Sequence, residues 1–258
     1  MSKIADAFQN KKAFIPFVTA GDPTLDVTKE ILFAMQEAGA DLIEIGIPFS
    51  DPVAEGPVIQ EADDRALASG TTTDKIFELL NGIKEQIHIP MVFMTYFNPI
   101  YAYGVEKFVK NAKECGICGM IVPDLPFEER EEIRGILNAN GLELISMIAP
   151  TSAERVKMIA KEAQGFVYCV SSLGVTGVRT KISTGISALI KQVKEVTDIP
   201  CAIGFGISTP EQATEMAKIS DGAIVGSAIV KIVARHGEDS ASYVRDYVKE
   251  MKQAVCRA

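Results

Sequence analysis

Eight short apolar runs recur along the 258 residues of this chain, each followed by a polar or Gly-rich turn and then by an amphipathic stretch. Buried parallel strands have this continuous apolar character, because helices cover both faces of such a sheet. Strands that alternate with helices predict βαβ units. The expected strands are Ala13–Thr19, Asp41–Ile47, Pro90–Tyr96, Gly119–Pro123, Leu142–Ala149, Gly165–Val170, Pro200–Gly204 and Gly222–Val225.

The stretches between these runs have the apolar spacing of helices. Thr209-Pro210 has the pattern of an N-cap followed by proline at the first helical position, and Ser152 also stands where a cap is expected. We expect one additional helix, Lys3–Gln9, to plug the bottom of the fold. The other expected helices are Leu25–Gly39, Val105–Cys115, Glu128–Asn140, Ser152–Ala163, Ile186–Thr197, Pro210–Ile219 and Asp239–Ala254.

Eight βα units in a chain of this length predict a closed (β/α)8 barrel with an extra N-terminal helix, since such barrels typically need about 250 residues. A doubly wound open sheet is the alternative fold. It usually needs fewer strands, and no G-x-G-x-x-G motif follows the first run. No linker or low-complexity segment interrupts the chain, so we expect residues 1–258 to form a single domain.

Composition narrows the class of protein further. A net charge of −8 argues against nucleic acid and anionic membranes as partners, although backbone dipoles can still bind a small phosphate ligand. The five cysteines are odd in number and mostly flanked by apolar residues, so they imply no disulfide framework. The chain has no signal-peptide run and no stretch of 18 uninterrupted apolar residues, which leads us to expect a cytoplasmic protein.

Two glycine-containing segments predict a phosphate site. Gly204–Ser208 follows the seventh expected strand, and Gly226–Val230 follows the eighth. Glycine lets the backbone approach an anion closely, and a helix that starts at Ser227 would direct free N–H groups toward it. The loops after strands 7 and 8 form the usual phosphate site of such barrels. Ordinary turn glycines are the alternative interpretation.

Two glutamates follow each other at the second expected strand. Glu44 lies within the apolar run, and Glu55 lies in the Pro/Gly-rich loop after it. If Glu44 points into the barrel mouth, burial raises its pKa and suits it to acid–base catalysis. Two carboxyls in different environments can divide the acid and base roles. The alternative for Glu44 is an outward side chain paired with a helix cation.

A long Gly/Ser/Thr-rich segment, Ser171–Thr184, follows the sixth expected strand. Long βα loops of this kind are often lids over the active site, and the alternative is a surface loop without a functional role. Within it, Arg179 and Lys181 supply the dense positive charge near the expected mouth. We expect trypsin to cut this segment in the free protein and a substrate analogue to slow the cut.

Other polar and aromatic residues are less informative. Tyr96 and Tyr168 could line a pocket for a flat apolar ligand or belong to the core. Asp124 could support the site or end a turn. Cys115 and Cys118 have the spacing of a zinc or redox pair, but no second pair and no histidine lies nearby, so we expect no metal. The two histidines, His88 and His236, are not at strand ends expected to be catalytic.

Several of these segments together resemble the tryptophan synthase α subunit family. The run from Glu44 to Gln60, EIGIPFSDPVAEGPVIQ, resembles its second strand and loop and is the most specific match. Pro16–Pro23 resembles its first βα junction. Ser171–Gly177, Gly204–Ser208 and Gly226–Val230 resemble its sixth, seventh and eighth loops, in the right order. The resemblance covers essentially the whole chain.

The resemblance implies a lyase that splits indole-3-glycerol phosphate into indole and glyceraldehyde 3-phosphate by a retro-aldol reaction. Glu44 would be the principal acid and base. The loop carboxylate, usually aspartate in the family and here Glu55, would accept the indole N–H. Thr176 would bond this carboxylate on lid closure. Phe17, Tyr96 and Tyr168 would flank the indole, and Gly177, Gly206, Gly226 and Ser227 would hold the phosphate.

The resemblance also implies a partner and assigns the cofactor to it. The family works as an αββα complex that passes indole to a β subunit carrying pyridoxal phosphate, and Asp51 with the 52–57 loop would lie near that contact. No cofactor is expected in this chain. Two alternatives are an isomerase or epimerase acting on a sugar phosphate, and a subunit kept mainly to activate β, which the Glu55 departure allows.

Overall fold

The computed structural model describes residues 3–170, 184–204 and 206–258, and in these the strands form one parallel sheet. The strand order is β5-β4-β3-β2-β1-β9-β8-β7-β6, with every described pair parallel. The strands are β1 (Ala13–Thr19), β2 (Ile43–Gly46), β3 (Met91–Met94), β4 (Ile117–Ile121), β5 (Glu143–Leu144), β6 (Ser146–Ile148), β7 (Val167–Val170), β8 (Cys201–Gly204) and β9 (Gly222–Val225).

The sheet closes into a barrel at Ile145. This residue separates β5, which pairs with β4, from β6, which pairs with β7. The Ile145 amide also donates to the Met120 carbonyl at 2.8 Å. A single segment therefore pairs with β4 on one side and with β7 on the other. The predicted strand Leu142–Ala149 is one position in the barrel, occupied by two short strands. The predicted (β/α)8 fold is confirmed.

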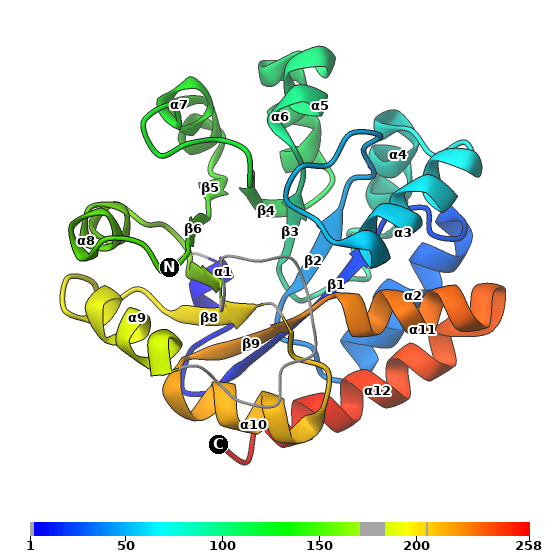
Figure 1. Cartoon of the computed structure of the whole chain (residues 1–258). Helices are drawn as coiled ribbons and strands as arrows, with labels where there is room; N and C mark the ends of the chain where they lie inside the picture. Colours follow the sequence, from blue (N-terminus) through cyan, green and yellow to red (C-terminus); the bar gives the residue numbers. More distant parts are fainter. Residues whose placement is uncertain (1–2, 171–183, 205) are drawn as a thin grey trace.

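Helices surround the strands, as Figure 1 shows. Thr209 and Ser152 cap helices as predicted, each accepting an N–H from three residues further on. The helices are α1 (Lys3–Asp6), α2 (Leu25–Glu37), α3 (Pro57–Ala68), α4 (Thr73–Ile83), α5 (Phe97–Tyr103), α6 (Val105–Glu114), α7 (Glu131–Asn140), α8 (Ala153–Lys161), α9 (Thr184–Lys194), α10 (Pro210–Ile219), α11 (Ser227–His236) and α12 (Ser240–Val255), with a 3-10 turn at Gly237–Asp239.

The sequence prediction omitted α3, α4 and α5, and it made the first helix too long. After Asp6 the backbone continues in tighter turns, in which the amides of Ala7, Phe8 and Gln9 bond to carbonyls three residues back. The α-helix therefore ends one turn earlier than predicted. None of the helices in the described residues is long and apolar enough to cross a membrane.

The barrel interior is an apolar core closed at the bottom by α1. Ile4, Ala7 and Phe8 pack against inward-facing strand residues such as Ile15 and Phe166, and α1 lies among the strands in Figure 1. The Phe8 and Phe166 ring centroids are 5.6 Å apart. In the described residues the amino-terminal end of the barrel is therefore filled, which leaves its carboxyl end open to a ligand.

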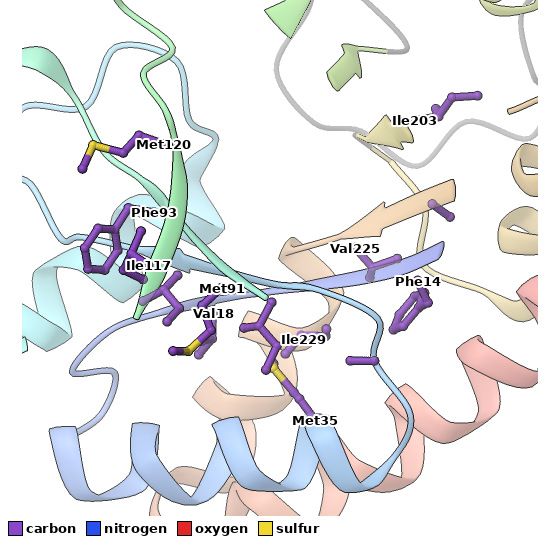
Figure 2. Close-up of a cluster of buried hydrophobic side chains, with 14 of the residues drawn as sticks. Phe14, Val18, Met35, Met91, Phe93, Ile117, Met120, Ile203, Val225 and Ile229 are labelled. Carbon is purple, nitrogen blue, oxygen red and sulfur yellow. The ribbon is translucent and has the colours of Figure 1, made fainter. Parts of the chain in front are cut away.

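A larger apolar layer fills the space between the barrel and its outer helices. Figure 2 shows part of this layer, in which Met35 of α2 and Ile229 of α11 reach toward side chains of the strands, including Phe14 and Val225. All of these side chains are fully buried. This packing fixes the strand ends, and with them the loops that carry the polar residues.

Candidate active site

Glu44 points into the mouth of the barrel from β2. It is 1% exposed and aligned with Phe17 of β1 and Val92 of β3. Its Oε2 atom is buried and receives no hydrogen bond from the described residues. Burial, and to a lesser degree the nearby Glu55 carboxyl, raises the pKa of Glu44 to about 8. The side chain is therefore a neutral acid at neutral pH.

Glu55 reaches the same space from the loop between β2 and α3. Its neighbours fix the backbone: the Ala54 amide donates to the Tyr96 hydroxyl at 2.9 Å, and the Gln60 side chain donates to the Glu55 carbonyl at 2.9 Å. Burial raises the pKa of Glu55 to about 7, and the contacts with Asp63 and the Tyr96 hydroxyl, which lower it, offset only part of this rise. Glu55 therefore has a more polar environment than Glu44.

Asp63 is a third carboxyl of this cluster, which the sequence prediction did not include. It lies on the buried face of α3 and is 4% exposed. Its side chain contacts the Glu55 carboxyl and accepts a hydrogen bond from the Phe49 backbone. Burial and the Glu55 charge raise the pKa of Asp63. The signal in the sequence was an aspartate in the apolar stripe of Ile59, Ala62 and Ala66.

A cavity of about 320 Å³ opens in front of the two glutamates, within the size range of small-molecule sites. Its walls come from the carboxyl ends of β1, β2, β3, β7 and β9 and from the loops after β2, β8 and β9, as the barrel fold predicts. The residues that line it are Phe17, Glu44, Ala54, Glu55, Gly56, Pro57, Val58, Ile59, Met94, Tyr168, Gly206, Ile207, Ser208, Ile224, Gly226, Ser227, Ala228 and Lys231.

One end of the cavity is suited to an anion. Gly226, Ser227 and Ala228 line it at the N-terminus of α11, where backbone N–H groups and the helix dipole favour negative charge. Gly206 lines the same cavity from the loop after β8. Lys231, an exposed residue one turn into α11, adds a positive charge that the sequence prediction missed. It stands four residues after Ser227 and so shares its helix face.

The apolar wall is formed by Phe17 and Tyr168, and glycines make room for both rings. A Cβ atom on Gly46 would lie 2.6 Å from the Phe17 ring, and one on Gly204 would lie 2.4 Å from the Tyr168 hydroxyl. Tyr168 is 5% exposed and close enough to Glu44 to feel its charge. The cavity therefore has aromatic side chains beside the buried acid.

Tyr96 and Asp124 have supporting positions. Tyr96 is not among the described residues that line the cavity. Instead it packs against Phe49, with ring centroids 5.5 Å apart, and its hydroxyl holds the Ala54 amide. Asp124 accepts the Phe97 amide at 2.9 Å, at the start of α5. Both residues therefore fix loops around the site.

Some predicted site residues lie outside the described residues. These are Thr176, Gly177, Arg179 and Lys181. Among the described residues no group of three or more His, Cys, Asp or Glu side chains could hold a metal ion. The five cysteines are free thiols.

The fold and the site together define a class of protein, a (β/α)8-barrel enzyme with buried carboxyls beside an anion-binding helix terminus. Residues 4–256 match the family model described as tryptophan synthase alpha chain. The tryptophan synthase alpha chain of Lacticaseibacillus casei is 46% identical over 255 residues, which cover 99% of this chain and 96% of that protein. The chain belongs to the tryptophan synthase alpha chain family, whose members are carbon–carbon lyases acting on indole-3-glycerol phosphate.

Solved structures agree with this assignment. Tryptophan synthase subunit alpha from Legionella pneumophila str. Paris has a TM-score of 0.91 and 36% identity, with 100% of both chains covered. A chain of the tryptophan synthase complex from Pyrococcus furiosus has a TM-score of 0.86 and 37% identity, covering 93% of this chain and 98% of that chain. The family resemblance stated from the sequence is confirmed.

Proposed function

We propose that Glu44 performs the acid–base work of the family reaction, the cleavage of indole-3-glycerol phosphate to indole and glyceraldehyde 3-phosphate, and that Glu55 stabilises charge on the indole ring. The observation that carries the proposal is that both carboxyls open on the cavity that the α11 N-terminus also lines. A phosphate at that terminus would leave the indole between Phe17 and Tyr168, beside Glu44. The substrate would thus span the cavity from the anion end to the aromatic wall.

Glu44 serves as acid and then as base. In its neutral form it gives a proton to the indole carbon that carries the glycerol chain. The resulting carboxylate takes the proton of the hydroxyl on the adjacent chain carbon, and the bond between the two carbons breaks. Its electron pair restores the indole ring while the hydroxyl carbon becomes the aldehyde. Glu44 ends protonated, so one residue completes the cycle.

Glu55 acts on the indole nitrogen. Protonation of the ring carbon places positive charge on the nitrogen, and a carboxylate that accepts the N–H stabilises this charge in the transition state. Gly206, Gly226 and Ser227 bind the phosphate through backbone N–H groups, and Lys231 adds charge at that end. These positions leave the reacting carbons beside Glu44.

We also propose a cytoplasmic α2β2 complex, in which indole passes to a β subunit that carries the pyridoxal phosphate. The 50–54 loop offers the docking surface, because Val53 is 79% exposed although apolar, and Ser50 and Asp51 beside it are exposed as well. The choice of this loop also follows the resemblance of the run Glu44–Gln60 to the second strand and loop of the family. This surface adjoins Ala54 and Glu55, so docking and catalysis would share one loop.

The test is release of glyceraldehyde 3-phosphate from indole-3-glycerol phosphate, measured with and without a β subunit. We expect slow release by the chain alone and faster release with the partner. Glu44→Gln should bind a non-cleavable analogue of indole-3-glycerol phosphate normally and lose nearly all turnover. Near-normal turnover by this variant would remove Glu44 as the acid and base. No release under either condition would favour a purely regulatory subunit or another sugar-phosphate reaction.

A further inference from the structure

Two buried acids contact each other on the loop side of the cavity. The Asp63 side chain from α3 reaches the Glu55 carboxyl, and in the part of the chain that the structure describes no cation acts on the pKa of either group. The nearest cation along α3, Arg65, is engaged with Asp22 at 2.8 Å. Two carboxylates that touch without a cation repel each other strongly, so both cannot remain ionised.

Hydrogen-bond geometry leads to the same conclusion. Glu55 Oε2 is buried and receives no hydrogen bond from the ordinary donors of the described residues. A buried carboxylate oxygen without a donor is costly. A proton on Asp63 supplies this donor, because a neutral carboxyl donates one O–H. The Phe49 backbone meanwhile donates to Asp63 and fixes its orientation.

We propose that Asp63 is a positioning residue for Glu55: the two carboxyls share one proton, with Asp63 as the neutral member that donates its O–H to the Glu55 carboxylate. This inference rests on the role of Glu55 proposed above. A glutamate side chain has several rotamers, and fixing it costs conformational entropy. The Asp63 contact selects the rotamer that faces the cavity and keeps Glu55 ionised, so that it can accept the indole N–H.

Charged and titratable groups face the pair from three sides. The Tyr96 hydroxyl approaches Glu55 from the end of β3, Glu44 faces it across the cavity from β2, and Asp64 adds negative charge from α3. The two acids oppose ionisation of the pair, and the tyrosine hydroxyl favours a carboxylate at Glu55. The surroundings therefore favour a pair with one proton and one charge.

The kinetic test combines Asp63→Ala, Glu55→Ala and the double variant, with Glu61→Gln as the control because Glu61 is exposed on the same helix. We expect D63A to lower kcat about tenfold, the value of a hydrogen bond to a charged group. KM should stay within about twofold, since Glu55 acts mainly in the transition state. In the E55A background D63A should cause no further loss, because Asp63 acts through Glu55.

The spectroscopic test is independent of turnover. At neutral pH the infrared band of protonated carboxyls should lose intensity in D63A relative to the wild type, and E61Q should leave the band unchanged. Asp63→Asn should show the same loss of band intensity but keep most of kcat, because its amide N–H can donate to the Glu55 carboxylate in place of the O–H. This variant has nearly the size of aspartate and covers the case in which D63A does not fold. An unchanged band would overturn the shared proton.

Failure of this inference differs from failure of the proposed function. If E55A keeps normal turnover, the role of Glu55 is wrong and the role of Asp63 falls with it. If E55A loses turnover while D63A retains it, only the Asp63 inference is overturned. An equal loss from D63A in the wild-type and E55A backgrounds would likewise overturn it, because the effect would then not pass through Glu55.

Discussion

Burial of one side chain, Glu44, should set the upper pH limit of the proposed reaction. Its pKa is raised to about 8, chiefly by burial, and the proposed first step needs its neutral form. We predict that kcat falls as the pH rises through about 8, where the acid form is lost. Turnover measured across this pH range checks the prediction, and binding of a non-cleavable analogue of indole-3-glycerol phosphate serves as the control. A kcat that stays level above this pH would contradict an acid role for Glu44.

The same burial makes the free energy of unfolding depend on pH, because the ionised form of Glu44 is costly in the folded protein. The pKa is higher in the folded chain, about 8, than the ordinary value of 4.5, so folding is favoured by the proton that Glu44 keeps. This contribution is fully present below 4.5 and is lost as the pH rises through about 8. Glu44→Gln should therefore raise the melting temperature more on the alkaline side of this window than on the acid side. Exposed Glu85→Gln, the control, should show no such difference.

At the scale of single strands and helices, glycine at the end of β8 leaves the space that Tyr168 occupies. A Cβ atom on Gly204 would lie 2.4 Å from the Tyr168 hydroxyl and 2.5 Å from its ring, so the tyrosine must move. We predict that Gly204→Ala costs about 1–3 kcal/mol of stability by overpacking and also lowers turnover. Denaturant unfolding and aldehyde release measure the two effects.

A glycine in α4 provides the matched control. A Cβ atom on Gly82 meets nothing within 4 Å, so Gly82→Ala should stabilise the protein by about 0.5–1 kcal/mol through helix propensity alone. Its turnover should equal that of the wild type. If G204A proved as harmless as G82A, Tyr168 would not be fixed by its neighbours.

The elements that the sequence analysis omitted show where pattern recognition failed. Pro57 opens α3 at a position that helices tolerate, but the preceding run of Pro and Gly favoured a loop. The signal in α4 was clear, since Thr72 caps a stripe of Ile76, Phe77 and Leu80. Lys231 and Asp63 lie on helices whose orientation toward the cavity depends on tertiary packing. Their roles therefore could not be derived from spacing alone.

For the whole molecule, the alternation of strands and helices was sufficient to predict the barrel, whereas its point of closure was not evident. The run Leu142–Ala149 is mostly apolar and shows no break at Ile145, and only the pairing partners reveal that it divides there. Glu44 could be placed at the mouth because the fold assigns carboxyl strand ends to the site. Its elevated pKa depends on neighbours distant in sequence, and the structure was needed to identify them.

The bottom of the barrel should support stability without affecting the chemistry. Ile4 of α1 is fully buried, and its side chain lies 2.9 Å from where a Cβ on Gly119 would stand and 3.0 Å from where one on Gly165 would stand. It thus contacts β4 on one side of the closure point and the turn before β7 on the other. Truncation at this position leaves a cavity that the strands cannot fill.

We therefore predict that Ile4→Ala lowers the free energy of unfolding by about 2–5 kcal/mol. Below its melting temperature the variant should keep the kcat and KM of the wild type, because the site lies at the opposite end of the barrel. Val53→Ala, at a residue 79% exposed, is the control and should leave stability nearly unchanged. An unchanged melting temperature in I4A would mean that α1 does not close the barrel. Loss of kcat at full stability would mean instead that the two ends of the barrel are coupled.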